Sequence, residues 1–476
     1  MLTEASALSL AGQLHSSHIA ERSQLDYVRR YWKGRQALPT VIPSAAPREV
    51  RVMARIARVN VIQIVVDSLA QSTFVDGFRA GNEDSTDTEV WATWQANKLD
   101  ARQTGIHRAT FAYGAAYAVV LPGDPVPVIR GASPRALHAL YGDDEDWPVY
   151  ALERRSRSAY RLYDADAIYA LRYRGEPGPQ PAVSQASIEQ ARVQQGGNSS
   201  WELVGTLEHG AGVCPVVRYL DEHDLDIDDE APAQRLMDTA TWEMYEAPAR
   251  GQVSPLMPVQ DQIDLTTFGL LTAQWYGAFR QRYAIGWVAE DEKEKAQAAA
   301  SQLWTFDREP DEMQLGEFQQ TELDGYIKSR EASMRHSAAL SQTPAHELIG
   351  ELVNLSAEAL AAAEAGRDRK VDEKKTVLGE SHEQTLRLAG ELGGQEVPDG
   401  AQCVWRDTSA RAFSATVDAL GKLATMLGVP PQELWERIPG VTRQDVERWR
   451  AAFESGDAFA ELSALLERQA PEPPEV

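Results

Sequence analysis

Cysteine is scarce in this sequence: its 476 residues include only two, Cys214 and Cys403. Two distant cysteines provide neither a disulfide framework nor a zinc site, so we expect a reducing compartment. No apolar run approaches the roughly 18 residues that a transmembrane helix requires, because the best one, 59–69, contains Asn, Gln and Asp. The segment 1–14 has no basic stretch ahead of an apolar one, so no secretory signal is expected. These absences predict a soluble, intracellular protein.

Positive charge is also in short supply. Asp and Glu total 71 against 47 Lys and Arg, which gives a net charge of −24. Proteins that grip nucleic acid tightly usually carry a basic surplus, because neutralised phosphates supply most of the non-specific affinity. The sequence therefore excludes a general DNA-coating protein, although local basic residues could still touch DNA, or the chain could handle DNA without binding it tightly. The alternative is that the acidic surplus serves solubility alone.

The rest of the composition is that of a folded protein. Apolar residues make up 43% and charged residues 25% of the chain, which excludes a largely disordered protein. At about 150 residues per domain, a chain of 476 residues is expected to form roughly three units.

Motifs that would indicate catalysis or a cofactor are missing. The only Gly-Lys pair, Gly421-Lys422, has Thr416 where a phosphate-binding loop needs its first glycine. Two His-Glu pairs lack the histidine four residues on that a helical zinc site needs. The acidic run 224–228 resembles the start of a calcium loop but lacks its glycine and its bidentate glutamate. We expect no catalytic residue, no metal site and no cofactor, which favours a mechanical or assembly role.

Apolar residues recur at helical spacing in the N-terminal part of the chain. The predicted helices cover 17–35, 49–70, 90–97 and 99–113. From 115 to 220 the pattern changes to short runs rich in Val, Ile and Tyr between Pro, Gly and Asp turns, which favours a mixed or antiparallel sheet. The strand-like runs are 116–121, 126–129, 149–154, 167–173, 201–207 and 216–219, and the polar stretches 175–200 and 221–230 are expected to be loops.

Helices dominate the second half of the sequence. Pro258 suits the first turn of a long helix that is predicted to reach Tyr283. After a break at 342–355, Ser356 is expected to cap another long helix with an acidic first turn. The further predicted segments are an insert at 284–322 with strand-like runs 284–288, 303–306 and 313–318, a helix over 323–340, a strand-like run at 402–406 and a helical tail over 409–469.

Two long helices that flank a small insert suggest a mechanical element. An antiparallel helix pair with a terminal knob, rooted in a mixed domain, is a plausible spoke of a ring. The alternative is an ordinary helical hairpin inside a globular enzyme, and the pattern alone does not separate the two.

Five motifs in order resemble those of phage portal proteins of the Gp6-like (SPP1-type) family, over nearly the whole chain. They are Tyr-Trp-Lys-Gly at 31–34, Asn60 followed by Ile-Val-Val-Asp at 64–67 and Gly77, Trp-Gln-Ala-Asn at 94–97 with Tyr-Gly-Ala-Ala-Tyr at 113–117, Gly-Val-Cys-Pro-Val-Val at 212–217, and Ser-Ala-Glu-Ala-Leu at 356–360.

The resemblance implies an α+β fold with portal-protein architecture: a mixed α/β wing, a two-helix stem, a small α/β clip, a tunnel loop with a long helix, and a helical crown. Its implied boundaries are an N-terminal helical segment at 1–48, wing at 49–255 with a return strand at 393–410, stem helices at 256–283 and 323–341, clip at 284–322, tunnel loop at 342–355, long helix at 356–392, and crown with a disordered tail at 411–476.

The resemblance also implies a function and partners. Such proteins form a ring of about twelve subunits at one capsid vertex, through which double-stranded DNA is packaged and ejected. They bind the terminase large subunit, later the head-completion (adaptor) proteins, and during assembly in the host cytoplasm the scaffolding and major capsid proteins. No cofactor and no membrane are implied. The alternatives are a nucleic-acid-processing enzyme of the packaging apparatus, or a monomeric scaffold or adaptor.

Three sets of residues follow as candidate sites from this map. In the second stem helix, Lys328 and Arg335 lie seven apart on one face, with Arg330 offset from it, so they are expected to face the channel. The alternative is that they are solvated and pair with a neighbouring subunit. The second set is the tunnel-loop residues Gln342, Thr343, His346, Glu347 and Asn354; the alternative is that this segment is only a connector between two helices. The third set is the clip aromatics Trp287, Trp304 and Phe306, expected to form a surface for partners; the alternative is that they pack in the core of the clip.

Overall fold

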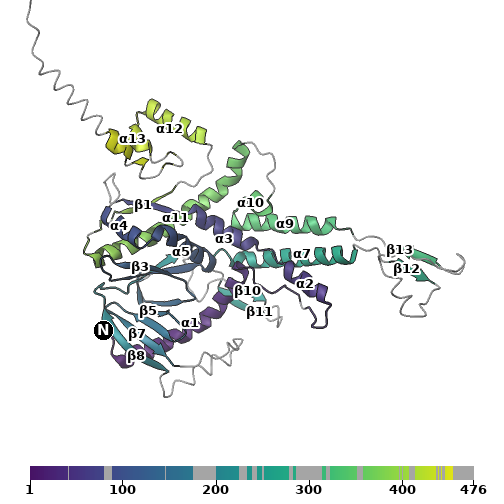
Figure 1. The fold of residues 1–476 in the computed structure, drawn as a ribbon, viewed down its shortest axis with the longest axis horizontal. Helices are drawn as coiled ribbons and strands as arrows, with labels where there is room; N and C mark the ends of the chain where they lie inside the picture. Colours follow the sequence, from purple (N-terminus) through teal and green to yellow (C-terminus); the bar gives the residue numbers. More distant parts are fainter. Residues whose placement is uncertain are drawn as a thin grey trace, which may run out of the picture. The chain divides into compact units, whose positions relative to one another are not determined.

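A computed structural model provides the coordinates of the chain. The residues it describes are 1–40, 42–79, 88–144, 146–174, 200–223, 233–237, 244–248, 251–277, 282–285, 314–317, 322–350, 357–395, 397–398, 400–406, 413–435, 438, 441, 445–446 and 448–453. The chain divides into two compact units, Met1–Trp405 and Arg406–Val476. Helices and antiparallel strands are mixed in the first unit, which confirms the α+β fold class (Figure 1).

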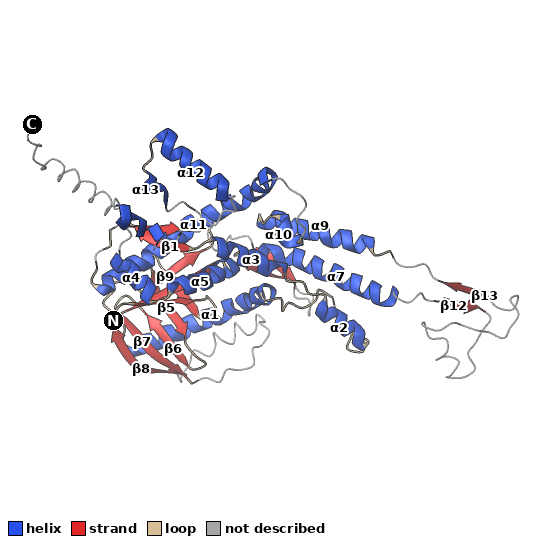
Figure 2. Cartoon of the chain, turned by 45° about the horizontal axis from the view of Figure 1, so that its top comes forward, coloured by secondary structure: helices blue, strands red, loops and turns tan. Residues whose placement is uncertain are grey.

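Helices account for most of the described residues (Figure 2). In the first unit they are α1 (Glu4–Trp32), α2 (Arg48–Ile56), α3 (Val61–Ser72), α4 (Thr88–Ala96), α5 (Leu99–Tyr113), the 3-10 helix η1 (Ser254–Leu256), α7 (Met257–Gly277), α9 (Asp324–Ser341), α10 (Ala345–Ile349) and α11 (Ala357–Gly393). The second unit contains α12 (Phe413–Leu427) and α13 (Pro431–Leu434).

Two antiparallel sheets form the body of the first unit. One has three strands in the order β3-β2-β9, and the other has five in the order β4-β5-β6-β7-β8. Their bounds are β2 Ala115–Leu121, β3 Val128–Ala132, β4 Leu137–Tyr141, β5 Pro148–Arg154, β6 Ala159–Tyr163, β7 Ala167–Tyr173, β8 Trp201–Glu208 and β9 Val216–Leu220. Three two-stranded pairs join β1 (Val75–Arg79) to β14 (Gln402–Trp405), β10 (Ala233–Met237) to β11 (Met244–Pro248), and β12 (Arg282–Ile285) to β13 (Gln314–Glu317).

Two of the helix predictions were wrong in their bounds. The first helix begins at Glu4 rather than residue 17, because Thr3 caps it and Ala7, Ala11 and Leu14 pack into a buried cluster with strands of the five-stranded sheet. The helix predicted over 49–70 is two helices, α2 and α3. The break falls where the Asn60 side chain accepts a hydrogen bond from the Gln63 N–H and so starts a new helix.

Sheet predictions succeeded where apolar runs were long. All six predicted strands in the body are present as β2, β3, β5, β7, β8 and β9. The strands β1, β4 and β6 were missed because a polar or charged residue interrupts each apolar run. The pairing of β1 with β14 brings residues more than 300 positions apart into one ladder, which places the predicted strand-like run at 402–406 beside β1.

The second half of the chain largely follows the predictions. The break at 342–355 is not entirely irregular, because Pro344 precedes the short helix α10, which ends at Gly350 with a φ of +77°. The long helix predicted to reach Tyr283 ends at Gly277, and the strand-like run 303–306 lies outside the described residues. The predicted helical tail is interrupted, since Gly428, with a φ of +69°, and Pro430 separate α12 from α13.

Candidate functional site

The helices α7 and α9 form an antiparallel pair that lies side by side in Figures 1 and 2. Gly269 of α7 lies directly under the ring of Tyr326 in α9, so close that a Cβ atom there would come within 3.0 Å of it. The 21 residues of α7 make it about 30 Å long. The chain passes from α7 through β12 and β13 into α9, so the pair carries the β12–β13 unit at the end where it is joined.

A buried polar network fixes the root of α7. Asp264 is fully buried and accepts hydrogen bonds from Gln36 Nε2 at 2.7 Å, Gln260 Nε2 at 2.8 Å and the Val59 N–H at 3.1 Å. One turn earlier, Asp261 accepts a hydrogen bond from the Tyr31 hydroxyl at 2.9 Å, and burial raises the pKa of Asp261 to about 6. Tyr31 lies at the end of α1, Gln36 in the loop that follows, and Val59 just before α3. These contacts therefore fix the direction of α7 relative to α1 and α3.

Two lysines on α11 lie at the same end of the pair, where α7 begins and α9 ends. Lys370 Nζ donates to the Ser341 carbonyl at the end of α9, at 2.9 Å, and to the side chain of Gln252, shortly before α7 begins. Lys374 is only 2% exposed; its Nζ donates to the Asp221 carbonyl at 2.7 Å and lies 3.3 Å from a carboxylate oxygen of Asp221. Burial raises the pKa of Asp221 and lowers that of Lys370, because each charged group has lost contact with solvent.

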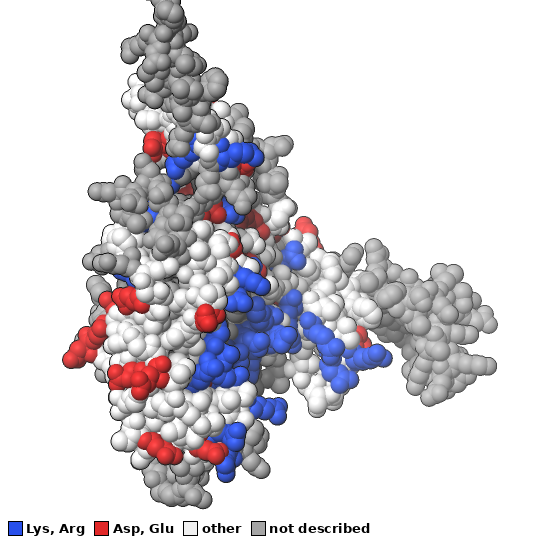
Figure 3. Space-filling view, turned by 60° about the vertical axis from the view of Figure 1, so that its left-hand side comes forward, with Lys and Arg blue, Asp and Glu red and all other residues white. Residues whose placement is uncertain are grey.

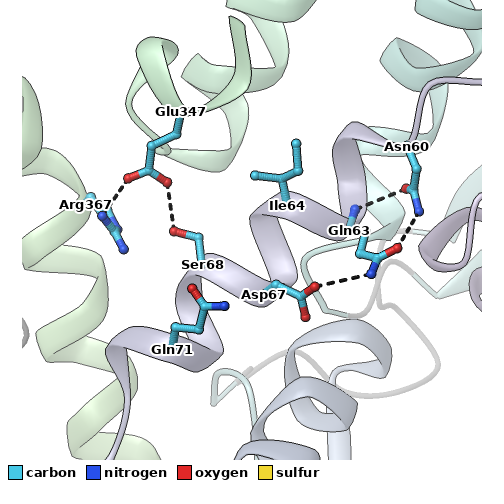
Figure 4. Close-up of a pocket in the computed structure, with 8 residues that line it drawn as sticks. All are labelled: Asn60, Gln63, Ile64, Asp67, Ser68, Gln71, Glu347 and Arg367. Atoms are coloured by element: carbon cyan, nitrogen blue, oxygen red, sulfur yellow. Dashed lines mark hydrogen bonds and ion pairs between the residues drawn. The ribbon is translucent and has the colours of Figure 1, made fainter. Parts of the chain in front are cut away.

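The segment after α9 is anchored by a three-helix contact, drawn in Figure 4. Glu347 of α10 accepts from Arg367 Nη1 of α11 at 2.6 Å and from the Ser68 hydroxyl of α3 at 2.9 Å. Arg367 also donates to the Ser72 hydroxyl at 2.7 Å. Glu347, Arg367 and Ser68 border an open pocket of about 640 Å³, whose other lining residues are Asn60, Gln63, Ile64, Asp67 and Gln71.

A second buried network joins the three-stranded sheet to α11. His107 Nε2 and His382 Nε2 lie 2.8 Å apart, so one ring donates to the other. Their outer nitrogens contact the Thr73 carbonyl at 3.0 Å and the Tyr219 hydroxyl at 3.1 Å. Burial lowers the pKa of His107 to about 4 and also lowers the pKa of His382 well below its ordinary value. The pair is therefore neutral near pH 7 and links α5, β9 and α11.

The basic residues predicted on the second helix divide between two faces. Lys328 and Arg335 are exposed. Helical spacing places both on the side of α9 opposite Ser333 and Ser337, which are buried. Arg335 lies 3.4 Å from Glu331 one turn before it. Arg330 is half-buried and belongs to the inner side with Ser333, as its predicted offset implies.

The residues predicted for the tunnel loop have different environments. Gln342 is exposed and ends α9 in a left-handed conformation, with a φ of 54°. Thr343 is buried, His346 is half-buried, and Glu347 is held by Arg367 and Ser68. Asn354 lies outside the described residues, and so do all three clip aromatics, Trp287, Trp304 and Phe306.

The sequence reasoning missed a basic surface and both buried networks. Nine Lys and Arg residues and two Asp and Glu residues lie between 22 and 58, a net charge of +7 in a chain of −24, and this local surplus was a readable signal. The partners in the two networks lie too far apart along the chain for spacing to reveal them.

Within the part of the chain that the structure describes, no cluster of His, Cys, Asp or Glu could hold a metal ion. No described helix is long and apolar enough to cross a membrane.

Comparison with known proteins gives consistent relatives. The model of a family described as phage portal protein, SPP1 Gp6-like, matches residues 12–456. The chain is 27% identical over 433 residues to the portal protein of Mycobacterium phage L5, covering 86% of this chain and 82% of that protein. It is also 27% identical over 422 residues to the portal protein of Mycobacterium phage D29, covering 84% and 80%. The family match confirms the resemblance carried by the five motifs.

Among the solved structures, chains of gene transfer agent (GTA) particles show similarity to this chain. A chain of the native GTA virion matches with a TM-score of 0.44 at 13% identity, covering 82% of this chain and 92% of that one. A chain from the neck of the empty GTA particle, computed with C6 symmetry, matches with a TM-score of 0.45 at 12% identity and the same coverage.

Proposed function

The chain belongs to the phage portal protein family of the SPP1 Gp6-like type, and we propose that about twelve copies form a ring around a channel for double-stranded DNA. The ring occupies one capsid vertex and serves as the head-to-tail connector for DNA packaging and ejection. The observation that carries the proposal is the α7–α9 pair, rooted at one end in buried polar networks and joined at the other through β12 and β13.

The portal map assigns a mechanical role to each part of the chain. We assign the wing to 49–255 with 393–410, the stem to 256–283 and 323–341, and the clip to 284–322. The segment 342–355 is the tunnel loop, 356–392 the long helix, and 411–476 the crown with its tail. The polar networks at the ends of α7 and α9 support this division, since they are suited to passing force between the stem and the wing.

The charge of the chain supports a channel that DNA slides through. If about twelve subunits surround it, a net charge of −24 each sums to roughly −290. A mostly negative wall repels the phosphate backbone at close range, within a Debye length of about 8 Å. Lys328 and Arg335, which are exposed on one face of α9, then act as weak brakes on moving DNA. Arg330 is half-buried, so we give it a smaller share in this contact.

The segment after α9 has an anchored side and an open side. Glu347 ties α10 to α3 and α11, and Thr343 is buried, so these two residues position the segment. Gln342 and His346 are more accessible and are the side chains of this segment that we expect to meet DNA, together with Asn354.

The partners are those of a portal vertex. We expect the clip, with Trp287, Trp304 and Phe306, to receive the terminase large subunit during packaging and the head-completion proteins afterwards. Scaffolding and major capsid proteins surround the ring during assembly in the host cytoplasm, and the mature location is the virion. We propose no catalytic residue, no cofactor and no membrane contact.

The mass of the assembled protein tests this proposal. Native mass spectrometry of the full chain should show one closed species of about twelve subunits. A dimer or tetramer as the final state would contradict it. An ATP hydrolysis assay on the same sample distinguishes a portal protein from the alternative, a nucleic-acid-processing enzyme of the packaging apparatus. A portal ring without its motor should show no ATP turnover above a buffer control.

A further inference from the structure

The helix α2 presents a stripe of arginines. Arg48, Arg51 and Arg55 recur at spacings of three and four, which places them on one face, and Arg58 follows just beyond the helix end. All four are exposed, and Met53 and Ala54 occupy the buried face. Among the residues that the structure describes, no carboxylate lies within ion-pair distance of these four arginines.

The sequence around the stripe is also basic, with nine Lys and Arg against two Asp and Glu between 22 and 58. Figure 3 shows Lys and Arg side chains gathered on one face, where few acidic side chains interrupt them. At the end of α1, burial lowers the pKa of Lys33; the nearby Asp67 opposes this shift, and Arg108, Arg29 and Arg35 add to it. Like charges held together in this way favour an acidic partner, because such a partner relieves their repulsion.

An apolar groove runs beside the stripe, between α2 and α7. Trp275 is 56% exposed, Ile56 59% and Val52 47%, and all three line the groove together with Met53, Leu271, Arg48, Glu49 and Gln274. Exposed tryptophan next to arginine is the composition that carries most binding energy at protein interfaces. Contacts to a DNA backbone instead come mainly from basic and polar groups, so the groove favours a protein partner.

A second copy of this chain supplies the acidic partner. Since residues 22–58 carry +7, the remainder of each chain carries −31, so a second copy offers a surplus of carboxylates to the stripe. A ring needs a heterologous contact, in which two different faces of the subunit meet. In Figures 1 and 2, α2 and α9 lie on opposite sides of α7, which is the placement that such a contact requires.

We propose that the surface formed by Arg48, Arg51, Arg55, Val52, Ile56 and Trp275 binds an acidic face of the neighbouring subunit in the ring. The apolar groove supplies the desolvated centre of the contact and the arginines its charged rim. The inference rests on the proposed ring, and it adds which face of the subunit closes it.

Charge reversal tests the surface. The double variant Arg51→Glu with Arg55→Glu should fold as the wild type does, because both side chains are exposed, but should raise the protein concentration needed for half assembly at least tenfold. The matched control is Arg102→Glu with Arg157→Glu, two exposed arginines that also lack a carboxylate partner among the described residues and lie outside α2 and α7. Native mass spectrometry at several salt concentrations measures the assembled fraction, and circular dichroism checks the fold.

The outcomes separate the inference from the proposed function. Assembly lost in the double variant and kept in the control supports the inference. Rings that form equally well in both overturn it and leave the portal function standing, whereas a wild type that never forms rings overturns both. A photo-crosslinker at Ile56 should join two copies of the chain within the ring. Failure to crosslink, or loss of binding to a short DNA duplex with assembly unchanged, would also overturn the inference.

Discussion

Glu347 and Arg367 form an ion pair at 2.6 Å that joins α10, within the break at 342–355, to the long helix α11 that follows it. Both side chains are largely shielded, and the Ser68 hydroxyl shares Glu347. The contact fixes the short helix that follows α9, so the segment proposed to narrow the channel has one rigid side.

Removing this pair should loosen α10. The variant Glu347→Ala leaves the Arg367 guanidinium with Ser72 alone, and we expect the free energy of unfolding to fall by about 2 kcal/mol. Limited proteolysis should then cut within 342–350 faster than in the wild type. The control Asp372→Asn changes an exposed carboxylate of α11 that forms no side-chain contact within the described part of the chain, and it should change neither quantity. Equal protection of all three proteins would contradict the anchoring role.

The buried lysine on α11 should matter more than an exposed one. Lys374→Met removes the positive partner of the buried Asp221 carboxylate, so we expect a loss of about 3–5 kcal/mol in urea unfolding. Lys328→Met, at an exposed position of α9, should stay within about 0.5 kcal/mol of the wild type. If the two variants proved equally stable, Lys374 and Asp221 would not form the pair described above.

The stability of the protein should depend on pH through the His107–His382 pair. The pKa of His107 is lowered to about 4, so the unfolded chain binds more protons than the folded one between pH 6.5 and 4. Stability is therefore present above pH 6.5 and is lost as the pH falls, by up to about 1.4 kcal/mol per pH unit for each such histidine. Urea unfolding at pH 7.5 and 5.5 measures this.

A variant isolates the pair from other groups that titrate. His107→Gln should reduce the difference in unfolding free energy between the two pH values. His336→Gln, at an exposed position on α9, should leave that difference unchanged. The same pH dependence in wild type and His107→Gln would show that the buried pair is not its source.

One glycine is required for close packing rather than only for backbone freedom. Gly251 and Gly210 both adopt a left-handed conformation, with φ of +69° and +68°. A Cβ at Gly251 would lie 2.5 Å from the Gly114 nitrogen, whereas a Cβ at Gly210 meets nothing within 4 Å. Gly210→Ala should cost about 1–2 kcal/mol from the backbone alone, and Gly251→Ala about 2 kcal/mol more. Thermal unfolding of the two variants compares them, and equal losses would contradict the packing argument.

The basic face of α9 should affect DNA retention. Replacing Lys328 and Arg335 with serine removes the exposed positive charges that we place in the channel, so packaged DNA should be lost more readily from filled heads. A nuclease-protection assay on heads that carry the variant portal measures the retained DNA. Arg157→Ser is the control for an exposed arginine elsewhere. Unchanged packaging and retention in the double variant would rule out the braking role.

Local patterns predicted most elements correctly, and long-range contacts account for what they missed. The apolar runs of β2 and β9 and the helical spacing in α9 and α11 were readable from neighbouring residues. The early start of α1 was not, because its small residues Ala7 and Ala11 pack against strands more than 140 positions away.

The surroundings of the candidate residues were harder to predict than the fold. Helical spacing correctly separated the face of Lys328 and Arg335 from that of Arg330. It could not show that Thr343 is buried or that Glu347 is bound, because their surroundings come from α3 and α11. The spacing of Arg48, Arg51 and Arg55 could have predicted the arginine stripe of α2. It was missed because the net charge of −24 drew attention away from local basic segments.

Electron microscopy of the purified full-length protein tests the central claim most directly. The account predicts ring-shaped particles of about twelve subunits, each with a central hole near the width of a DNA duplex. Particles that are compact dimers or tetramers without a channel would contradict it.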